Sequence, residues 1–197
     1  MRDMTIQEFC DKHYACPEGR EWALMRCRTM ADVWAAAKPA WLVWVATQNG
    51  VLTNRELRLF SVWAARQVQH LMVDPRSIEA LNVAERHANG AATDDELAAA
   101  ASAARDAAYA ARDALEAPHD KGIWEAALAA REAGSLELSA GWVVGESAGA
   151  AEAVAAAAGG RAAGDAAWAA TTAAQSDWLR ANTTPNFEVK ETSQCAT

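Results

Sequence analysis

The stretch Thr93–Glu116, TDDELAAAASAARDAAYAARDALE, decides the fold because it joins a helix start signal to a long run of helix-forming residues. Thr93 followed by Glu96 is a capping-box pattern, and two aspartates after Thr93 place negative charge at the positive end of the helix dipole. Beyond the cap, small apolar residues recur at steps of three and four, as on one face of a helix. This stripe consists of Leu97, Ala101, Ala104, Ala108, Ala111 and Leu115. The stretch predicts a capped helix whose smooth faces let neighbouring helices approach closely.

The composition of the whole chain agrees with an all-helical fold. About a quarter of the 197 residues are alanine, and the chain has nine Trp but only two Tyr and three Phe. Alanine favours helix strongly, and few residues here favour strand. Because alanine buries little apolar area, we expect the tryptophans to supply the bulk of the core.

Further start and stop signals divide the rest of the chain into helices. Thr5 with Glu8 and Thr53 with Glu56 repeat the capping-box pattern, and Asp74-Pro75 is a cap followed by a first-turn proline. The apolar run 40–47, AWLVWVAT, is short enough to be helix or strand, and its helical neighbours favour helix. We predict an all-α fold: a Trp-rich N-terminal helical cap (1–52), an antiparallel alanine-rich helical bundle (53–181) and a polar C-terminal tail (182–197) that we expect to be poorly ordered.

Charge is unevenly distributed along the chain. The formal net charge is −8; residues 1–90 carry 11 basic and 10 acidic side chains, whereas residues 91–197 carry 7 basic and 16 acidic ones. An acidic surface repels nucleic-acid phosphates, so we expect no nucleic-acid partner. If a partner binds the second half by charge, it should be a basic protein surface.

The sequence predicts a cytoplasmic protein without a membrane partner. Residues 1–13, MRDMTIQEFCDKH, are polar and lack the apolar segment of a signal peptide. The apolar run 41–46 is too short to span a bilayer, and charged residues interrupt the alanine runs. We expect the four cysteines to be reduced thiols rather than a disulfide framework.

The predicted hairpin between Arg55 and His87 carries the candidate binding residues. Counting outward from its turn places Arg66 opposite Leu81–Asn82, with Glu85 about one turn away. One interpretation is an Arg–Glu network that stabilises the hairpin. The other is a cationic pocket, rimmed by an indole, for an anionic ligand or an acidic partner surface. The candidates are Trp63, Arg66, His70, Arg76, Glu85 and Arg86.

Two motifs suggest chemistry, and each has a structural explanation. Cys10, His13, Cys16 and Cys27 could supply four zinc ligands, but their spacing is loose and small buried thiols explain them as well, so we predict no metal. The run 145–149, GESAG, fits the Gly-x-Ser-x-Gly pattern of a nucleophile elbow, which needs a strand before it and a helix after it. All four histidines precede Ser147, so none follows it to complete a triad.

Glycines at steps of four residues suggest a helix-packing face. Gly141, Gly145 and Gly149 would lie along one side of the helix predicted for 139–158. Each glycine costs about 1 kcal/mol of helix propensity, so packing should compensate for it. The stripe predicts close approach of another helix, within the chain or in a homodimer.

The run LRLFSVWAARQVQHLMVDPRSIEALNVAERHANGAATDDELAAAASAARDAA, residues 57–108, resembles an alanine-rich helical domain of bacterial and phage-encoded proteins, some of which carry an immunity-protein label. Residues 9–24, FCDKHYACPEGREWAL, and residues 174–187, AQSDWLRANTTPNF, resemble parts of the same group. The resemblance implies toxin neutralisation or conflict with a host defence system, and it implies no catalytic residue.

Together these features predict a non-catalytic binding or inhibitory protein without a cofactor. The interpretation that we favour is an immunity or phage counter-defence factor that occludes a partner protein. The alternative is a sponge that sequesters a small anionic nucleotide signal between helices, near Trp63, Arg66 and Arg76.

Overall fold

The computed structural model describes residues 2–114, 120–135 and 140–189. Over these residues the chain is almost entirely helical, as predicted. It forms two short strands, one 3₁₀ helix and ten α-helices: β1 (Arg2–Asp3), α1 (Ile6–Lys12), α2 (Pro17–Arg26), α3 (Met30–Ala36), α4 (Pro39–Ala46), α5 (Asn54–Gln67), η1 (Gln69–Leu71), α6 (Pro75–Ala88), α7 (Asp94–Asp113), α8 (Asp120–Ala133), α9 (Ala140–Gly159), α10 (Arg161–Asn182) and β2 (Glu188–Val189). None of these helices is both long and apolar enough to cross a bilayer.

The helices begin where local signals in the sequence predict. Complete capping boxes precede α1, α3, α5 and α7, with a threonine side chain accepting from the backbone N–H three residues on. Prolines occupy the first positions of α2, α4 and α6. The run 40–47 is helical, as favoured. One end differs: α5 stops at Gln67 and gives way to η1, whereas the periodicity predicts a helix to about Met72.

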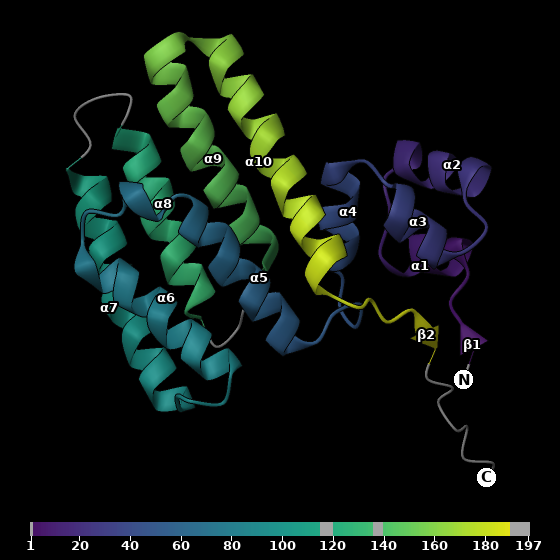
Figure 1. Cartoon of the computed structure of the whole chain (residues 1–197), viewed down its shortest axis with the longest axis horizontal. Coiled ribbons are helices and arrows are strands. Elements are labelled where there is room, and N and C mark those ends of the chain that lie inside the picture. Colours follow the sequence, from purple (N-terminus) through teal and green to yellow (C-terminus); the bar gives the residue numbers. More distant parts are fainter. Residues whose placement is uncertain (1, 115–119, 136–139, 190–197) are drawn as a thin grey trace.

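Helices α5 to α10 form an antiparallel bundle in which each helix packs against the next along the chain (Figure 1). The return of the chain brings α10 against α4, so the last helix joins the bundle to the N-terminal cap. On α7 the buried residues are Leu97, Ala100, Ala104, Ala107 and Ala108. The predicted stripe is therefore correct at Leu97, Ala104 and Ala108. Ala101 and Ala111 are only half-buried, and Leu115 lies outside the described residues.

Gly122 and Gly164 permit close contacts along the sides of neighbouring helices, and neither belongs to the predicted glycine stripe. A Cβ added at Gly122 of α8 would lie 2.7 Å from a methyl group of Val154 and 3.0 Å from the carbonyl oxygen of Ala150, both on α9. A Cβ at Gly164 of α10 would meet Ala156 of α9 at 2.9 Å. In contrast, a Cβ at Gly145 would have no neighbour within 4 Å.

The core has two parts, and the tryptophans serve only one of them. The bundle cluster around Leu81, Leu97 and Val143 consists of alanine, valine, leucine and methionine residues without any indole. The expectation that tryptophans supply the bulk of the alanine-rich bundle is therefore wrong. The other cluster takes six of them, either buried or packed against its edge: Trp22, Trp34, Trp41, Trp44, Trp63 and Trp178.

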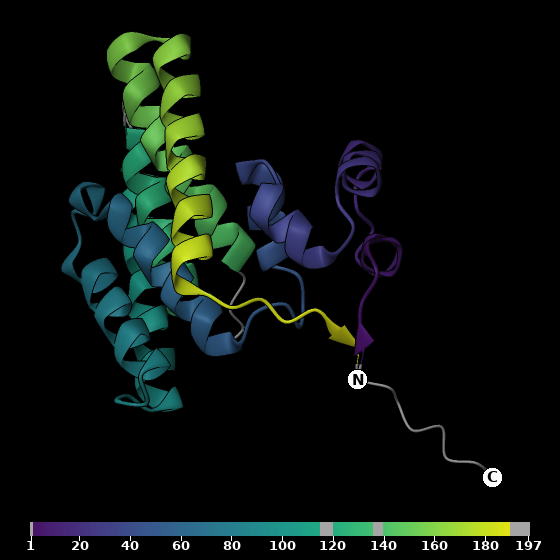
Figure 2. The same cartoon turned by 45° about the vertical axis from the view of Figure 1, so that its right-hand side comes forward.

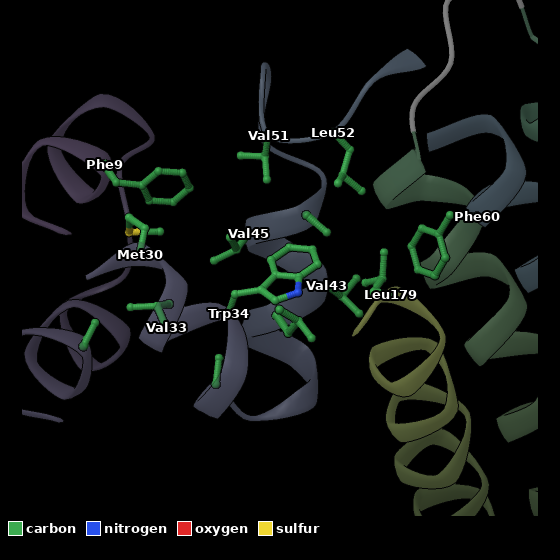
Figure 3. Packing of buried hydrophobic residues seen from close by; sticks show 14 of the residues in the cluster. Phe9, Met30, Val33, Trp34, Val43, Val45, Val51, Leu52, Phe60 and Leu179 are labelled. Carbon is green, nitrogen blue, oxygen red and sulfur yellow. The ribbon is translucent and has the colours of Figure 1, made fainter. Parts of the chain in front are cut away.

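This second cluster crosses from the cap into the bundle. Figure 3 shows Phe9, Met30 and Val33 on the cap side, Trp34 and Val45 in the middle, and Phe60 with Leu179 on the bundle side. Arg180 reinforces the joint from α10 by donating to the carbonyl oxygens of Trp34 and Ala37. The cap and the bundle are thus joined through a shared core.

The C-terminal segment also holds the cap, so the expectation of a poorly ordered tail is wrong up to Val189. After α10 the chain crosses to the cap, and β2 pairs antiparallel with β1 (Figure 2). Phe187 packs against the cap core, and its carbonyl oxygen accepts from the backbone N–H of Met4 at 2.7 Å. Asn186 donates its N–H to the carbonyl oxygen of Val51. Residues 190–197 lie outside the described part of the chain.

Candidate functional site

Arg66 occupies the place that the hairpin register predicts. One of its terminal nitrogens, Nη2, donates to the Oε2 of Glu85 at 2.6 Å and to the Oδ1 of Asn82 at 3.2 Å, and the other, Nη1, donates to Gln69. These bonds link the end of α5 and η1 to α6. The guanidinium of Arg66 therefore donates hydrogen bonds within the chain, as expected if the Arg–Glu network stabilises the hairpin.

Trp63 and His70 do not join Arg66 in a cationic pocket. The indole of Trp63 packs in the core that the cap and the bundle share, with ring centroids 6.4 Å from Phe60 and 5.6 Å from Trp178. Because α5 ends at Gln67, His70 belongs to η1, where it is exposed, instead of continuing the helical face of Arg66.

The remaining basic candidates are paired with nearby carboxylates. Arg76 binds the α6 N-cap residue Asp74 at 2.6 Å, and this hydrogen bond raises the pKa of Arg76 and lowers that of Asp74. Arg86 lies 3.7 Å from Glu79 and 4.0 Å from Glu96. The geometry thus favours a network that stabilises helix ends and the hairpin over an open anion site.

The elbow-like motif lies inside a continuous helix. Ser147 is fully buried on α9; its hydroxyl donates to the carbonyl oxygen of Val144 and accepts from Gln175 of α10 at 3.1 Å. A nucleophile elbow instead requires a sharp strand-to-helix turn that exposes the serine. In this structure Ser147 holds α9 and α10 together.

Cys10 and Cys16 have structural roles in the cap, and the candidate zinc ligands form no metal cluster within the described residues. No group of three or more His, Cys, Asp or Glu side chains there is arranged to hold a metal ion. Cys16 is the N-cap of α2, and its sulfur accepts from the N–H of Gly19 at 3.4 Å. Cys10 is buried in the cap core, and this burial raises the pKa of its thiol.

A groove with a different chemistry opens where α8, α9 and α10 meet. Its volume is about 540 Å³. We call it the acidic groove because three carboxylates and one ammonium line it, together with two indoles. Helix α8 contributes Lys121 and Glu125, α9 contributes Trp142, Glu146 and Glu152, and α10 contributes Trp168.

The predicted glycine stripe lines this groove. Gly141, Gly145 and Gly149 all face it, so α9 presents bare backbone between its larger side chains. A Cβ at Gly149 would lie 3.0 Å from the Oε2 of Glu125, whereas a Cβ at Gly145 would meet open space. Within the described chain the stripe makes room for a carboxylate and a hollow; the close helix contacts occur at Gly122 and Gly164.

Burial raises the pKa of two carboxyl groups of the groove, those of Glu125 and Glu146. Glu125 is only 8 % exposed, and burial raises its pKa, with nearby Glu152 adding repulsion and Lys121 opposing both. Burial likewise raises the pKa of Glu146, and the charge of Glu125 adds to this effect. Perturbed ionisable groups in a cleft are typical of functional sites.

The two indoles of the groove are unusually accessible for their size. Trp142 is 66 % exposed and Trp168 is 42 % exposed, whereas Trp34 in the cap core is 8 % exposed. Exposed indoles beside carboxylates can bind a cation through ring faces and ion pairs together. The acidic groove therefore has the chemistry of a site for positively charged groups.

A second cavity, of about 320 Å³, lies within the cap, and its chemistry is different. Its walls include Phe9, Trp22, Trp41 and Trp44, and they are largely apolar. None of the described residues lining it is Asp, Glu, Lys or Arg. It offers no charge with which to select a partner, so the acidic groove is the better candidate site.

The apolar periodicity of the sequence did not predict which face of α8 is buried, and the acidic groove depends on that face. The periodicity predicts Ile123, Trp124, Ala127 and Leu128 on the inner face of α8, but only Ala127 of these is buried. The face of Gly122 is buried instead, and it includes Glu125 three residues later. The signal in the sequence that could have indicated the groove is a carboxylate, Glu125, on a helix face made of glycine and alanine.

Comparison with known proteins identifies no relative of this chain. No family model, curated protein or solved structure matches it. The function must therefore be argued from the geometry.

Proposed function

We propose that this chain is a non-catalytic binding protein that occludes a basic partner protein through the acidic groove. The observation that carries the proposal is the joint presence of three carboxylates and two exposed indoles in one hollow. An immunity or counter-defence role, which the sequence resemblance implies, fits a protein whose activity is to cover a surface of its partner.

Interface energetics support this proposal. Tryptophan is enriched among the residues that dominate binding energy, and complementary charge speeds and orients association. The groove lies in the acidic half of the chain, so a basic partner would meet attractive charge around it as well. A stable protein interface buries about 800 Å² on each side, so the partner would extend over neighbouring helices.

A nucleotide sponge and a homodimer are the competing proposals. A nucleotide sponge requires free cations, whereas Arg66, Arg76 and Arg86 lie near carboxylates. A homodimer through Gly141, Gly145 and Gly149 would cover the acidic groove. Thermal stabilisation by nucleotides would favour the sponge, and a concentration-dependent dimer in light scattering would favour the homodimer.

Affinity capture from cells that carry this protein tests the proposal. The full-length chain is compared with the Trp142→Ala/Trp168→Ala double variant and with Tyr109→Ala, which removes an exposed aromatic residue from α7. We expect a basic protein to be retained by the wild type and Tyr109→Ala, released by salt, and lost from the double variant. Equal retention by all three forms would contradict the proposal.

A further inference from the structure

We infer that the acidic groove receives an arginine side chain of its partner, with the guanidinium directed to Glu125 and stacked on an indole. This inference rests on the proposed function and adds the chemical group that the groove recognises. An unpaired buried oxygen, the flanking carboxylates and indoles, and the glycines of α9 support it.

The first observation is that Glu125 lacks a partner for half of its carboxylate. Its Oε1 lies 3.3 Å from the ammonium of Lys121, but its Oε2 is buried and receives no hydrogen bond from the described residues. A buried carboxylate oxygen without a donor is costly, because the water it loses is not replaced. A cationic donor from a partner would supply the missing bonds.

The second observation is that the glycine side of α9 lies directly beside this oxygen. The Oε2 of Glu125 faces Gly149, where any Cβ would come within 3.0 Å. One turn earlier, Gly145 leaves open space within the same groove. The two glycines thus leave α9 without side chains between the open part of the groove at Gly145 and the carboxylate of Glu125.

The third observation selects arginine among cationic groups. The groove offers several carboxylates rather than one, and the Lys121 ammonium already neutralises part of their charge. A guanidinium can donate to two carboxylates through its fork, and its flat face stacks on indoles such as Trp142 and Trp168. It is also more weakly hydrated than the ammonium of lysine, so entering a partly buried groove costs less.

The test follows the indole N–H signals of the full-length protein by NMR during titration with N-acetyl-arginine amide. The signals of Trp142 and Trp168 are assigned from the Trp→Phe variant at each position. We expect both to shift and saturate, while the indoles of the cap stay unchanged. The neutral isostere N-acetyl-citrulline amide should produce no saturating shift, and N-acetyl-lysine amide should bind more weakly.

Variants complete the test. Glu125→Gln should weaken arginine binding about tenfold, as expected for losing a charged hydrogen-bond acceptor. Glu21→Gln, the same change at an exposed position of α2, should leave binding unchanged. Equal shifts with arginine and citrulline, or an unchanged affinity in Glu125→Gln, would overturn the inference.

The inference and the proposed function can fail separately. If groove variants lose the captured partner but arginine amide does not bind, the groove is an interface that recognises another group. If arginine amide binds at Trp142 and Trp168 but capture does not depend on these indoles, the proposed function is wrong and the arginine site stands.

Discussion

At the residue scale, Glu125 combines a cost for folding with the binding role that we propose for it. Its carboxylate lies on the buried face of α8, where Lys121 reaches one oxygen and no donor within residues 2–114, 120–135 and 140–189 reaches the other. Ionising it there is unfavourable, which is why its pKa is raised. A residue that lowers stability and lines a cleft has the profile of a functional group.

The stability of the fold should therefore depend on pH through Glu125. Because its pKa is raised in the folded state, its contribution is fully present below the ordinary carboxyl pKa and is lost as pH rises through the folded value. Replacing Glu125 with Gln removes the charge, so the variant should be about 1 kcal/mol more stable than the wild type at pH 7. The two should be nearly equal at about pH 4, where the wild type is largely protonated.

Urea unfolding at both pH values measures this difference. Glu146 is the neighbouring carboxyl whose pKa is also raised, and its other charged neighbours are Lys121, Arg131 and Glu132. These groups are still present in the Glu125→Gln variant, where the pKa of Glu146 should fall because the charge of Glu125 is lost. A variant less stable than the wild type at pH 7 would show that the Lys121 ion pair outweighs burial.

At the element scale, small residues have two different uses in neighbouring helices. Gly122 and Gly164 let helices touch, whereas Gly145 and Gly149 keep a groove open.

Arg58 on α5 binds the C-terminal end of α8. It is 6 % exposed and donates to the carbonyl oxygens of Ala133 and Ser135, which satisfies the C-terminal end of α8.

Alanine substitutions should separate these two uses. Gly122→Ala should destabilise the protein by about 1–3 kcal/mol, because its Cβ would overlap Val154 and approach the backbone of Ala150. Gly145→Ala should stabilise it by up to about 1 kcal/mol, because alanine favours helix and its Cβ meets open space. Thermal unfolding of both variants checks the prediction; destabilisation by Gly145→Ala would show that this stretch of α9 packs more closely than described.

At the scale of the whole molecule, two connections join the cap to the bundle. The core shared by α4, α5 and α10 forms one connection, and the segment from Thr184 to Val189 forms another. Within this segment, the ring of Phe187 lies 6.0 Å from Phe9 and 6.3 Å from Trp34. The cap should therefore depend on residues far from it in the sequence.

Phe187→Ala should destabilise the cap by about 2 kcal/mol, since it removes a half-buried ring from an aromatic cluster. The loss should appear as faster amide hydrogen exchange in α1 and α3. Exchange in α7 and α8, which pack elsewhere, should change little. Uniform acceleration in all helices would indicate that the cap and the bundle unfold as one unit.

Much of this fold could be predicted because helix starts are local signals. The threonine caps and first-turn prolines lie in the sequence next to the helices that they begin, and the short turn before α6 set Arg66 against Glu85. The acidic groove could not be predicted in the same way. Its residues come from three helices. Because most side chains of α8 are small and similar, its sequence does not determine which face is buried, and tertiary packing decides this.

The most direct test of the acidic groove as the binding surface fills it without removing any of its contacts. Gly145→Leu places a side chain in the open space of the groove, where a Cβ has no neighbour within 4 Å. We predict that this variant keeps the wild-type unfolding temperature or exceeds it, while partner capture falls to background and Tyr109→Ala retains full capture. Undiminished capture by folded Gly145→Leu would contradict the account.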